Sequence, residues 1–189
     1  QISLFAEAEL YKMMDSKFSD IRNYDPLLAS LKQFKPDVVL HLAAQSLVRK
    51  SYLSPRETYS TNVMGTLNIF EAVREVGGVK VILNITSDKC YENQEWLWAY
   101  RENEPMGGYD PYSNSKGCAE LVTSAFRSSL SILMALPGLT LIIMRYNSFV
   151  SGLIYSLRSK IIEVPSSSLL LISFGSVQKT NFMCNMAKY

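Results

Sequence analysis

The stretch KPDVVLHLAAQS, residues 35–46, decides the fold of this chain. After a turn proline it runs through β-branched and aliphatic residues to Ala44 without the polar alternation of a half-exposed strand. Unbroken apolar runs of this length are typical of strands that are buried on both faces, as in parallel sheets. The stretch therefore predicts a buried parallel strand.

The segment that follows, residues 54–78, carries the start and stop signals of a helix of about six turns. Ser54 stands where an N-cap belongs, Pro55 occupies the first helical position, Glu57 follows three residues after the cap, and two glycines end the segment. VKVILNITS, residues 79–87, then predicts a second buried strand. A helix that bridges two such strands makes a right-handed crossover in a parallel sheet.

Further along, a helical pattern covers residues 111–126, and LTLIIMR at 139–145 predicts a third strand. We therefore expect an α/β domain with a doubly wound parallel sheet. In such a sheet ligands bind outside the carboxyl ends of the strands. That rule directs the search for chemistry to LAAQS, residues 42–46, and to TSDKCY, residues 86–91.

Composition excludes several classes of protein. The 189 residues have a formal net charge of +2 with acids and bases interspersed, so we expect no nucleic acid partner. Three widely spaced cysteines and a single histidine predict a reduced, cytoplasmic protein without a metal site. The apolar run at residues 130–144 is short and is interrupted by Pro137 and Gly138, so we expect a strand after a turn and no membrane span.

Composition changes sharply after about Arg127. Of the 17 acidic residues, 16 lie in residues 1–127, whereas the last 62 residues hold only Glu163 and 12 serines. We therefore divide the chain into a partial domain at residues 1–129 and an atypical tail at 130–189. The tail is expected to add one further strand and then irregular sequence, and we hypothesise a frameshift or an otherwise unrelated translation.

Tyr112 and Lys116 lie four residues apart in YDPYSNSKGCAEL, residues 109–121, and so share one face of the predicted helix. An ammonium beside a phenol favours the phenolate, which would lower the tyrosine pKa and make Tyr112 a general base. The same spacing also occurs in an ordinary amphipathic first turn. That alternative stays open on the spacing alone.

Ser87, Asp88 and Lys89 follow the second predicted strand, at the edge where ligands bind. A serine that converges there with Tyr112 and Lys116 would form a site that oxidises a hydroxyl group: Ser87 would orient it, Tyr112 would take its proton and Lys116 would support the phenolate. The alternative is a solvated turn at the strand end, which serine and aspartate both favour.

Together these motifs resemble those of the extended short-chain dehydrogenase/reductase superfamily, and within it the family of CDP-glucose 4,6-dehydratases. The resemblance covers residues 1–129 and is carried by DIRNYDPLLASLKQFKPDVV, by HLAAQSLVRKSYLSPRETYSTNVMGT and by the long segment from NITSDKCY to SAFR. Lysine after the aspartate in TSDKCY separates this family from its dTDP-glucose relatives. The resemblance implies a Rossmann-like fold.

It also implies a reaction. Tyr112 would deprotonate the C4 hydroxyl of CDP-glucose while a hydride passes to a tightly bound NAD. Asp88 would donate a proton to the departing C6 hydroxyl, and Lys89 stands where relatives carry the base that acts at C5. A desolvated Lys89 near another cation would be neutral enough for that part. The product would be a 4-keto-6-deoxy sugar nucleotide for the biosynthesis of lipopolysaccharide O-antigen.

The resemblance also assigns binding residues. Asp20 and Ile21 would contact the adenine ring, and Ser46 together with Ser87 would contact the substrate. Lys116 and Tyr112 would also meet the nicotinamide ribose. The remaining NAD-binding positions are Leu42, Ala43, Ala44, Gln45 and Thr61.

Departures from the family pattern leave alternatives open. The Gly-rich turn that holds the pyrophosphate is expected before Gln1, and the family sequence that follows Arg145 is not recognisable here. The alternatives are an NAD-dependent epimerase or reductase of the same superfamily, or an inactive fragment. We expect a homodimer, with the helix from Ser54 as the candidate surface.

Other residues give weaker signals. We expect His41 to be a packed core residue and not a catalyst. Trp96 and Trp98 would either shelter the sugar nucleotide or pack their own loop. Cys90 and Cys118 are expected to be small buried fillers.

Overall fold

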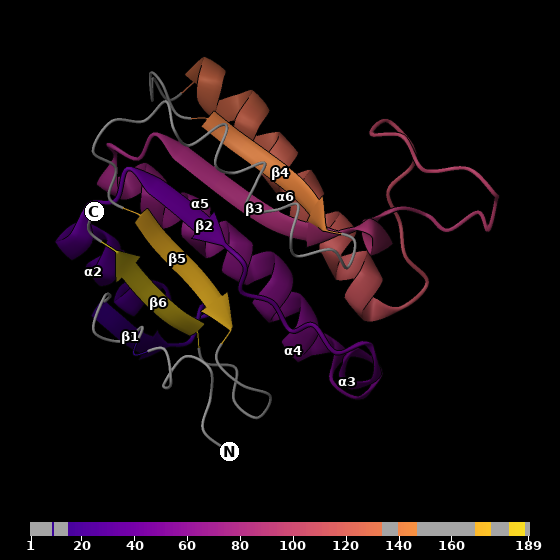
Figure 1. Ribbon diagram of the computed structural model, residues 1–189, viewed down its shortest axis with the longest axis horizontal. Coiled ribbons are helices and arrows are strands. Elements are labelled where there is room, and N and C mark those ends of the chain that lie inside the picture. Colours follow the sequence, from indigo (N-terminus) through magenta and orange to yellow (C-terminus); the bar gives the residue numbers. More distant parts are fainter. Residues whose placement is uncertain (1–8, 10–14, 134–139, 147–168, 175–181, 188–189) are drawn as a thin grey trace.

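The computed structural model describes residue 9 and residues 15–133, 140–146, 169–174 and 182–187. Its strands form one six-stranded sheet in the order β1-β6-β5-β2-β3-β4 (Figure 1). The strands are β1 (Asp15–Ser19), β2 (Val38–His41), β3 (Val81–Ser87), β4 (Thr140–Tyr146), β5 (Leu169–Phe174) and β6 (Phe182–Ala187). The helices are α2 (Tyr24–Phe34), α3 (Val48–Leu53), α4 (Pro55–Tyr59), η2 (Ser60–Met64), α5 (Gly65–Val76), η3 (Asp88–Cys90) and α6 (Pro111–Leu133).

The α/β prediction is confirmed in the middle of the sheet. β2 pairs in parallel with β3 from Val38 opposite Val81, and β3 pairs in parallel with β4 along its whole length. The first predicted strand ends at His41, three residues before Ala44. Its carboxyl end therefore lies next to that of β3, as the crossover rule requires.

Apolar packing explains why the helices lie on the sheet as they do. Figure 1 places α2, α5 and α6 on the same face of the sheet. The core on that face joins Leu27 and Leu31 of α2 to Phe70 of α5, Val39 of β2 and Ile82 of β3. The opposite sides of the same strands form a smaller cluster around Val38, Leu40 and Leu83. Both faces of β2 and β3 are thus buried, which explains their unbroken apolar sequence.

The predicted helix from Ser54 is present, but it is divided. α4 and α5 are joined by η2, a π-helical segment in which each turn holds more residues than an α-turn. The expected side-chain cap at Ser54 is wrong, because its side chain makes no capping hydrogen bond. Glu57, its expected partner in the cap, forms an ion pair with Lys50 instead, at 2.8 Å.

Beyond β4, which matches the third predicted strand, β5 and β6 join the sheet from within the tail. β5 pairs in parallel with β2, and β6 is antiparallel to both β5 and β1. These two strands were not anticipated from the sequence. The division at residue 129 falls inside α6, and most of the tail lies outside the described residues. The origin of residues 130–189 therefore stays a prediction.

Candidate active site

The site is built around the carboxyl end of β3. Ser87 is the last residue of the strand, is 9% exposed, and donates a hydrogen bond to Asp88 Oδ1 at 3.0 Å. Its hydroxyl also accepts from the backbone nitrogen of Lys89 at 3.3 Å. These bonds fix the turn from β3 into η3 and hold the serine hydroxyl at the edge of the sheet.

Asp110 sets the start of α6 and thereby the position of Tyr112. Its carboxylate accepts from the backbone nitrogen of Ser113 at 2.9 Å and from the Ser113 hydroxyl at 2.5 Å. Pro111 follows as the first helical residue, a position that suits its fixed φ angle. Tyr112 is therefore held in the first turn of the helix, next to the strand end.

Tyr112 and Ser87 meet there. The two side chains are close enough for Ser87 to act on the ionisation of the phenol, which is 9% exposed. Burial raises the pKa of Tyr112 above its ordinary value of 10.0, the neighbouring Ser87 side chain lowers it, and the carboxylates of Asp88 and Asp110 raise it further. The structure thus brings the predicted phenol and alcohol together.

Lys116 lies one turn further along α6 and is 7% exposed. Its Nζ donates to the carbonyl oxygen of Ile85, two residues before the end of β3, at 3.4 Å. Burial lowers the pKa of Lys116 from 10.5 to about 8, whereas Glu120 and Cys90 act to raise it. All three predicted groups therefore gather at one strand end.

One electrostatic expectation is wrong. The sequence predicted a lowered pKa for Tyr112, but the pKa is raised, and burial is the largest cause. Lys116 is not among the groups that shift the phenol. The ammonium is directed to the backbone of β3, so burial prevails over the attraction that the spacing suggested.

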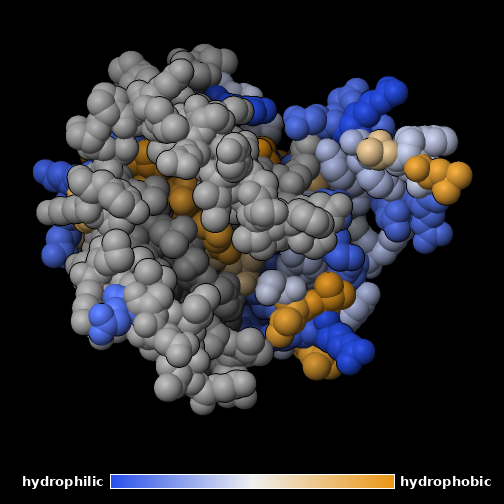
Figure 2. All heavy atoms as spheres, in the orientation of Figure 1, coloured by the Kyte–Doolittle hydropathy of each residue, from blue (hydrophilic) through white to orange (hydrophobic). Residues whose placement is uncertain are grey.

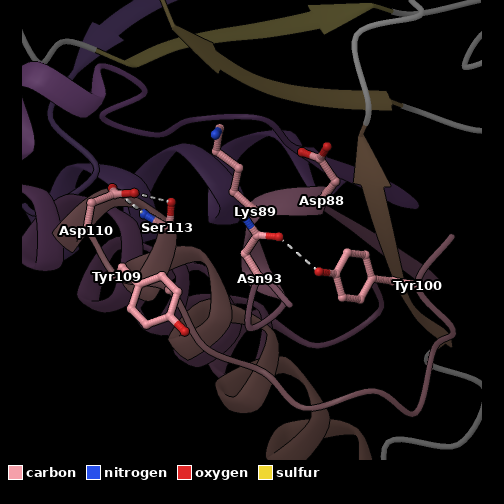
Figure 3. Close-up of a pocket in the computed structure, with 8 residues that line it drawn as sticks. Asp88, Lys89, Asn93, Tyr100, Tyr109, Asp110 and Ser113 are labelled. Carbon is pink, nitrogen blue, oxygen red and sulfur yellow. Dashed lines mark hydrogen bonds between the residues drawn. The ribbon is translucent and has the colours of Figure 1, made fainter. Parts of the chain in front are cut away.

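Asp88 and Lys89 open into a pocket of about 300 Å³ beside this group. Figure 3 shows both side chains extending from η3 in the same general direction. Both side chains are exposed. The expected desolvation of Lys89 is therefore not present in the structure. The other lining residues are Asn93, Tyr100, Gly108, Tyr109, Asp110 and Ser113.

The pocket wall comes largely from a long loop, residues 91–110, here called the arm. Its base is fixed by a bridge between Tyr91 and Met106. Along it Tyr91 stacks on Tyr100 at 5.1 Å between ring centres, and Trp96 contacts Tyr100 at 5.4 Å. Packing of the loop is thus what the structure shows for the tryptophans. Figure 2 shows the arm projecting from the body with hydrophobic surface at its outer end. Leu97, which belongs to the arm, is fully exposed.

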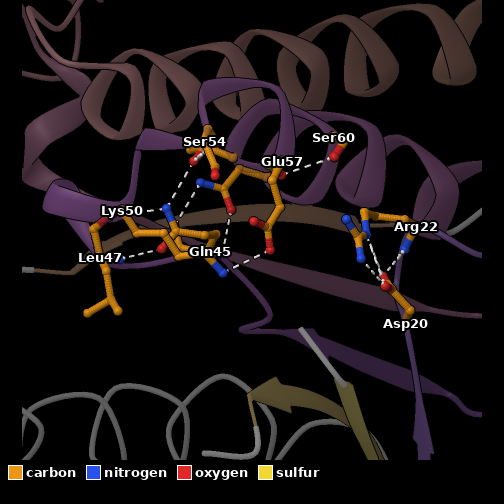
Figure 4. A network of polar contacts seen from close by, with 10 residues as sticks. Asp20, Arg22, Gln45, Leu47, Lys50, Ser54, Glu57 and Ser60 are labelled. Atoms are coloured by element: carbon orange, nitrogen blue, oxygen red, sulfur yellow. Dashed lines mark hydrogen bonds and ion pairs between the residues drawn. The ribbon is translucent and has the colours of Figure 1, made fainter. Parts of the chain in front are cut away.

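The segment that follows β2, residues 42–46, contains predicted cofactor positions. Ala43 and Ala44 are 3% and 5% exposed, so little side chain separates this backbone from its surroundings. The backbone and side-chain polar atoms of Gln45 have partners in Leu47, Thr58 and Asn62. Figure 4 shows Gln45 and Leu47 together beside the ion pair of Lys50.

Thr61 suits a ligand contact better. It is 1% exposed, and among the residues that the structure describes its hydroxyl has no hydrogen-bond partner. Ser46 is exposed beyond the strand end, and Leu42 is half-buried.

Asp20 and Ile21 lie after β1, away from the strand end at residue 87. The Asp20 carboxylate forms an ion pair with Arg22 at 2.5 Å (Figure 4). Ile21 is 1% exposed and packs in the main core, where a side chain at Gly65 would meet it at 2.8 Å. Ile21 is thus a core residue in this structure.

Asn62 is a structural residue that the sequence analysis missed. Its Oδ1 accepts from the Gln45 nitrogen at 2.7 Å, and its Nδ2 donates to the Gln45 oxygen at 3.1 Å and to the Ser115 hydroxyl at 2.8 Å. One buried amide therefore ties the loop after β2 to the helix that carries Lys116. Asn62 lies in the π-helical segment Ser60–Met64. The sequence does not reveal that segment, so no sequence signal marked this residue.

His41 is a packed core residue, as expected. It is 2% exposed, and its Nε2 lies 2.9 Å from the Thr66 hydroxyl. Burial lowers its pKa to about 3, and the charge of Lys116 acts in the same direction. Within the residues that the structure describes, no group of three or more potential metal ligands occurs. None of the described helices has the length and apolarity to cross a membrane.

Comparisons with known proteins agree with this fold. A family model described as GDP-mannose 4,6 dehydratase matches residues 5–161. CDP-glucose 4,6-dehydratase from Salmonella typhimurium is 63% identical over 127 residues, which are 67% of this chain and 35% of that protein. UDP-glucose 4-epimerase from Mycolicibacterium smegmatis is 31% identical over 110 residues, 58% of this chain and 34% of that protein. The chain thus spans about a third of the length of these curated relatives.

Solved structures give the same result. UDP-glucose 4-epimerase from Thermus thermophilus, in complex with NAD, has a TM-score of 0.58 at 28% identity, over 68% of this chain and 39% of that one. A dTDP-glucose 4,6-dehydratase from Streptomyces venezuelae has a TM-score of 0.58 at 21% identity, over 81% of this chain and 49% of that one. The second likeness concerns the fold alone.

Proposed function

We propose, from the premise that this chain belongs to the GDP-mannose 4,6 dehydratase family, that it carries the catalytic centre of an NAD-dependent CDP-glucose 4,6-dehydratase. The observation that carries this proposal is the convergence of Ser87, Tyr112 and the buried Lys116 at the end of β3. The 63% identity to the Salmonella typhimurium enzyme over 127 residues supports the choice of substrate.

The residues at the strand ends fit a nicotinamide dinucleotide. The buried Thr61 hydroxyl, which has no partner in the described part of the chain, is a donor that a bound ligand would satisfy. Small side chains at Ala43 and Ala44 would let the backbone approach it, and Lys116 would hold the ribose. When bound, NAD would accept a hydride from C4 of the sugar and return it to C6.

The chain's own side chains would handle protons. Tyr112 would take the proton of the C4 hydroxyl, and Ser87 would hold that hydroxyl in line through its own hydrogen bond. Lys116 would stabilise the phenolate as it forms, because a positive charge offsets the cost of a buried anion. In the unliganded protein the pKa of Tyr112 is raised and Lys116 does not shift it, so this stabilisation would arise in the complex with substrate.

Asp88 would protonate the C6 hydroxyl as it leaves. Its carboxylate lines the pocket, and its Oδ1 already accepts a hydrogen bond from Ser87. Lys89 lines the same pocket from the adjacent position and would act near C5. The pocket mixes carboxylate, amide, phenol and amine groups, which suits the hydroxyl groups of a hexose. A 4-keto-6-deoxy sugar nucleotide made in this way would supply polysaccharide biosynthesis in the cytoplasm.

We propose that the protein works as a homodimer, with the helix that starts near Ser54 as the candidate contact surface between the two subunits. An NAD-dependent epimerase is the second candidate function. It is favoured by the likeness to UDP-glucose 4-epimerases, and it would use Ser87, Tyr112 and Lys116 without needing Asp88. The third alternative is an inactive fragment.

One assay separates these functions. The protein is incubated with CDP-glucose and NAD, and the alkaline absorbance of a 4-keto sugar is recorded for the wild type and for Asp88→Asn. A keto product that is lost in the variant supports the dehydratase. A C4 epimer that survives the substitution selects the epimerase, and an absence of both turnover and retained NAD contradicts either activity.

A further inference from the structure

Glu120 is a buried acid to which the proposed reaction gives no part. It is 2% exposed, and it lies four residues after Lys116 on α6, so the two side chains share one face of the helix. Its Oε1 accepts from the Thr86 hydroxyl at 2.5 Å. An acid is rarely buried to this extent unless its charge is compensated.

The anchor for Glu120 belongs to a ladder of polar contacts between β3 and α6. Asn84 Nδ2 donates to the Thr123 hydroxyl at 2.8 Å, and Thr86 donates to Glu120. Two residues along a strand cover about 6.6 Å, which is near the rise of three to four helical residues. The helix runs opposite to the strand, so the next step of the ladder brings Lys116 level with the end of β3.

The charge of Lys116 needs such support. The lysine is 7% exposed, and its Nζ donates to the Ile85 carbonyl oxygen at 3.4 Å, which is long for a hydrogen bond. Titratable groups from three elements act on Lys116. Glu120 on α6 and Cys90 on η3 raise the pKa of Lys116. His41 on β2 is close enough for the charge of Lys116 to lower the pKa of His41. Of these three groups, Glu120 is the one with a carboxylate side chain, so it is the candidate for supporting the charge of Lys116.

We propose that Glu120 is a positioning residue: a buried carboxylate, anchored by Thr86, that keeps Lys116 charged and aligned with the end of β3. The proposed link stands on the shared face of α6 and on the anchor of Glu120 at Thr86, and only its catalytic consequence rests on the proposed function. Glu120 is proposed to affect the reaction through the lysine and not by contact with the reacting atoms.

The test is a titration that needs no substrate. The Cε resonances of ¹³C-labelled lysines are followed by NMR against pH, and Lys116 is identified by its loss in Lys116→Met. Lys116 is expected to titrate near pH 8 in the wild type, and about one unit lower or more in Glu120→Gln. An unchanged titration in that variant would overturn the proposal.

Matched variants separate charge from packing. Thr123→Val removes the neighbouring step of the same ladder but no charge, so Lys116 is expected to titrate as in the wild type. Glu120→Met is a second uncharged variant, and it should shift Lys116 in the same direction as Glu120→Gln. If circular dichroism finds neither uncharged variant folded, Glu120 serves the fold and not the lysine, and the proposal is overturned.

A kinetic arm applies where the wild type turns over. Glu120→Gln is then expected to lower kcat at pH 7.5 more than it changes KM, and to move the optimum to lower pH, where Lys116 regains its proton. Glu120→Asp restores the charge and should recover part of kcat. A wild type without activity would contradict the proposed function, yet it would leave the NMR result intact.

Discussion

The hydroxyl of Ser87, at the end of β3, lies next to the phenol of Tyr112 in the first turn of α6 and acts on its ionisation. A group that takes a proton must lie within hydrogen-bonding reach of the groups it works with. The pairing of these two residues therefore underlies the first prediction.

Tyr112→Phe is expected to lower kcat at least about a hundredfold, because the phenol is the proposed base. The alkaline absorbance of the keto product measures the loss, and unfolding in urea checks that the fold survives. Tyr52→Phe is the matched control, because that phenol is exposed on α3. Full activity in Tyr112→Phe would refute the assignment.

His41 gives the protein a pH-dependent stability. Its pKa is about 3 in the folded protein and 6.5 when unfolded, so the unfolded chain binds the extra proton between these values. Stability is therefore greatest above pH 6.5 and falls as the pH drops towards 3, by on the order of 4 kcal/mol. Urea unfolding at several pH values measures the slope.

His41→Gln is the comparison for that slope. The amide keeps a polar atom near Thr66 but does not titrate, so the variant is less stable overall and its stability changes less between pH 6.5 and pH 4. An equal slope in the wild type and the variant would show that other groups are responsible.

Gly108 lies where the arm crosses the first turn of α6. A Cβ atom there would stand 2.5 Å from Ser113 Cβ and 2.6 Å from the Asn114 nitrogen. Gly108→Ala is expected to cost about 1–3 kcal/mol and to displace Tyr112. Gly107→Ala is the control, because its Cβ would meet only Glu92, at 3.3 Å. Thermal unfolding compares them, and equal melting temperatures would contradict the steric argument.

Asn62 is expected to be a main determinant of stability outside the apolar core. Asn62→Asp keeps the acceptor for the Gln45 nitrogen but removes both donors and buries a charge, so we expect a loss of about 3 kcal/mol. Ser60→Ala, in the same π-helical segment, removes one half-exposed bond and should cost less than about 1 kcal/mol. Urea denaturation distinguishes the two, and similar losses would refute this role.

The sequence predicted what is encoded locally. The apolar runs around Val39 and Ile82 marked strands buried on both faces, and the spacing of Tyr112 and Lys116 placed both on one helix face. The rule that ligands bind at strand ends directed attention to Ser87, and the structure places Ser87 beside Tyr112.

What failed depends on contacts between distant segments. The direction of the Tyr112 pKa shift follows from burial, which the spacing of two residues does not report. The Asn62 amide meets Gln45 and Ser115, which are 17 and 53 residues away in sequence. The expected capping box at Ser54 was wrong because Glu57 has a better partner in Lys50.

The π-helical segment Ser60–Met64 sets the rotational phase between α4 and α5. Each residue advances a helix by about 100°, so deleting one residue there would leave a regular α-helix with α4 turned by that angle. Tyr59, whose hydroxyl donates to Asn114 Oδ1 at 2.7 Å, would then face away from α6. A change in the number of residues in this segment is therefore expected to break the contact between α4 and α6.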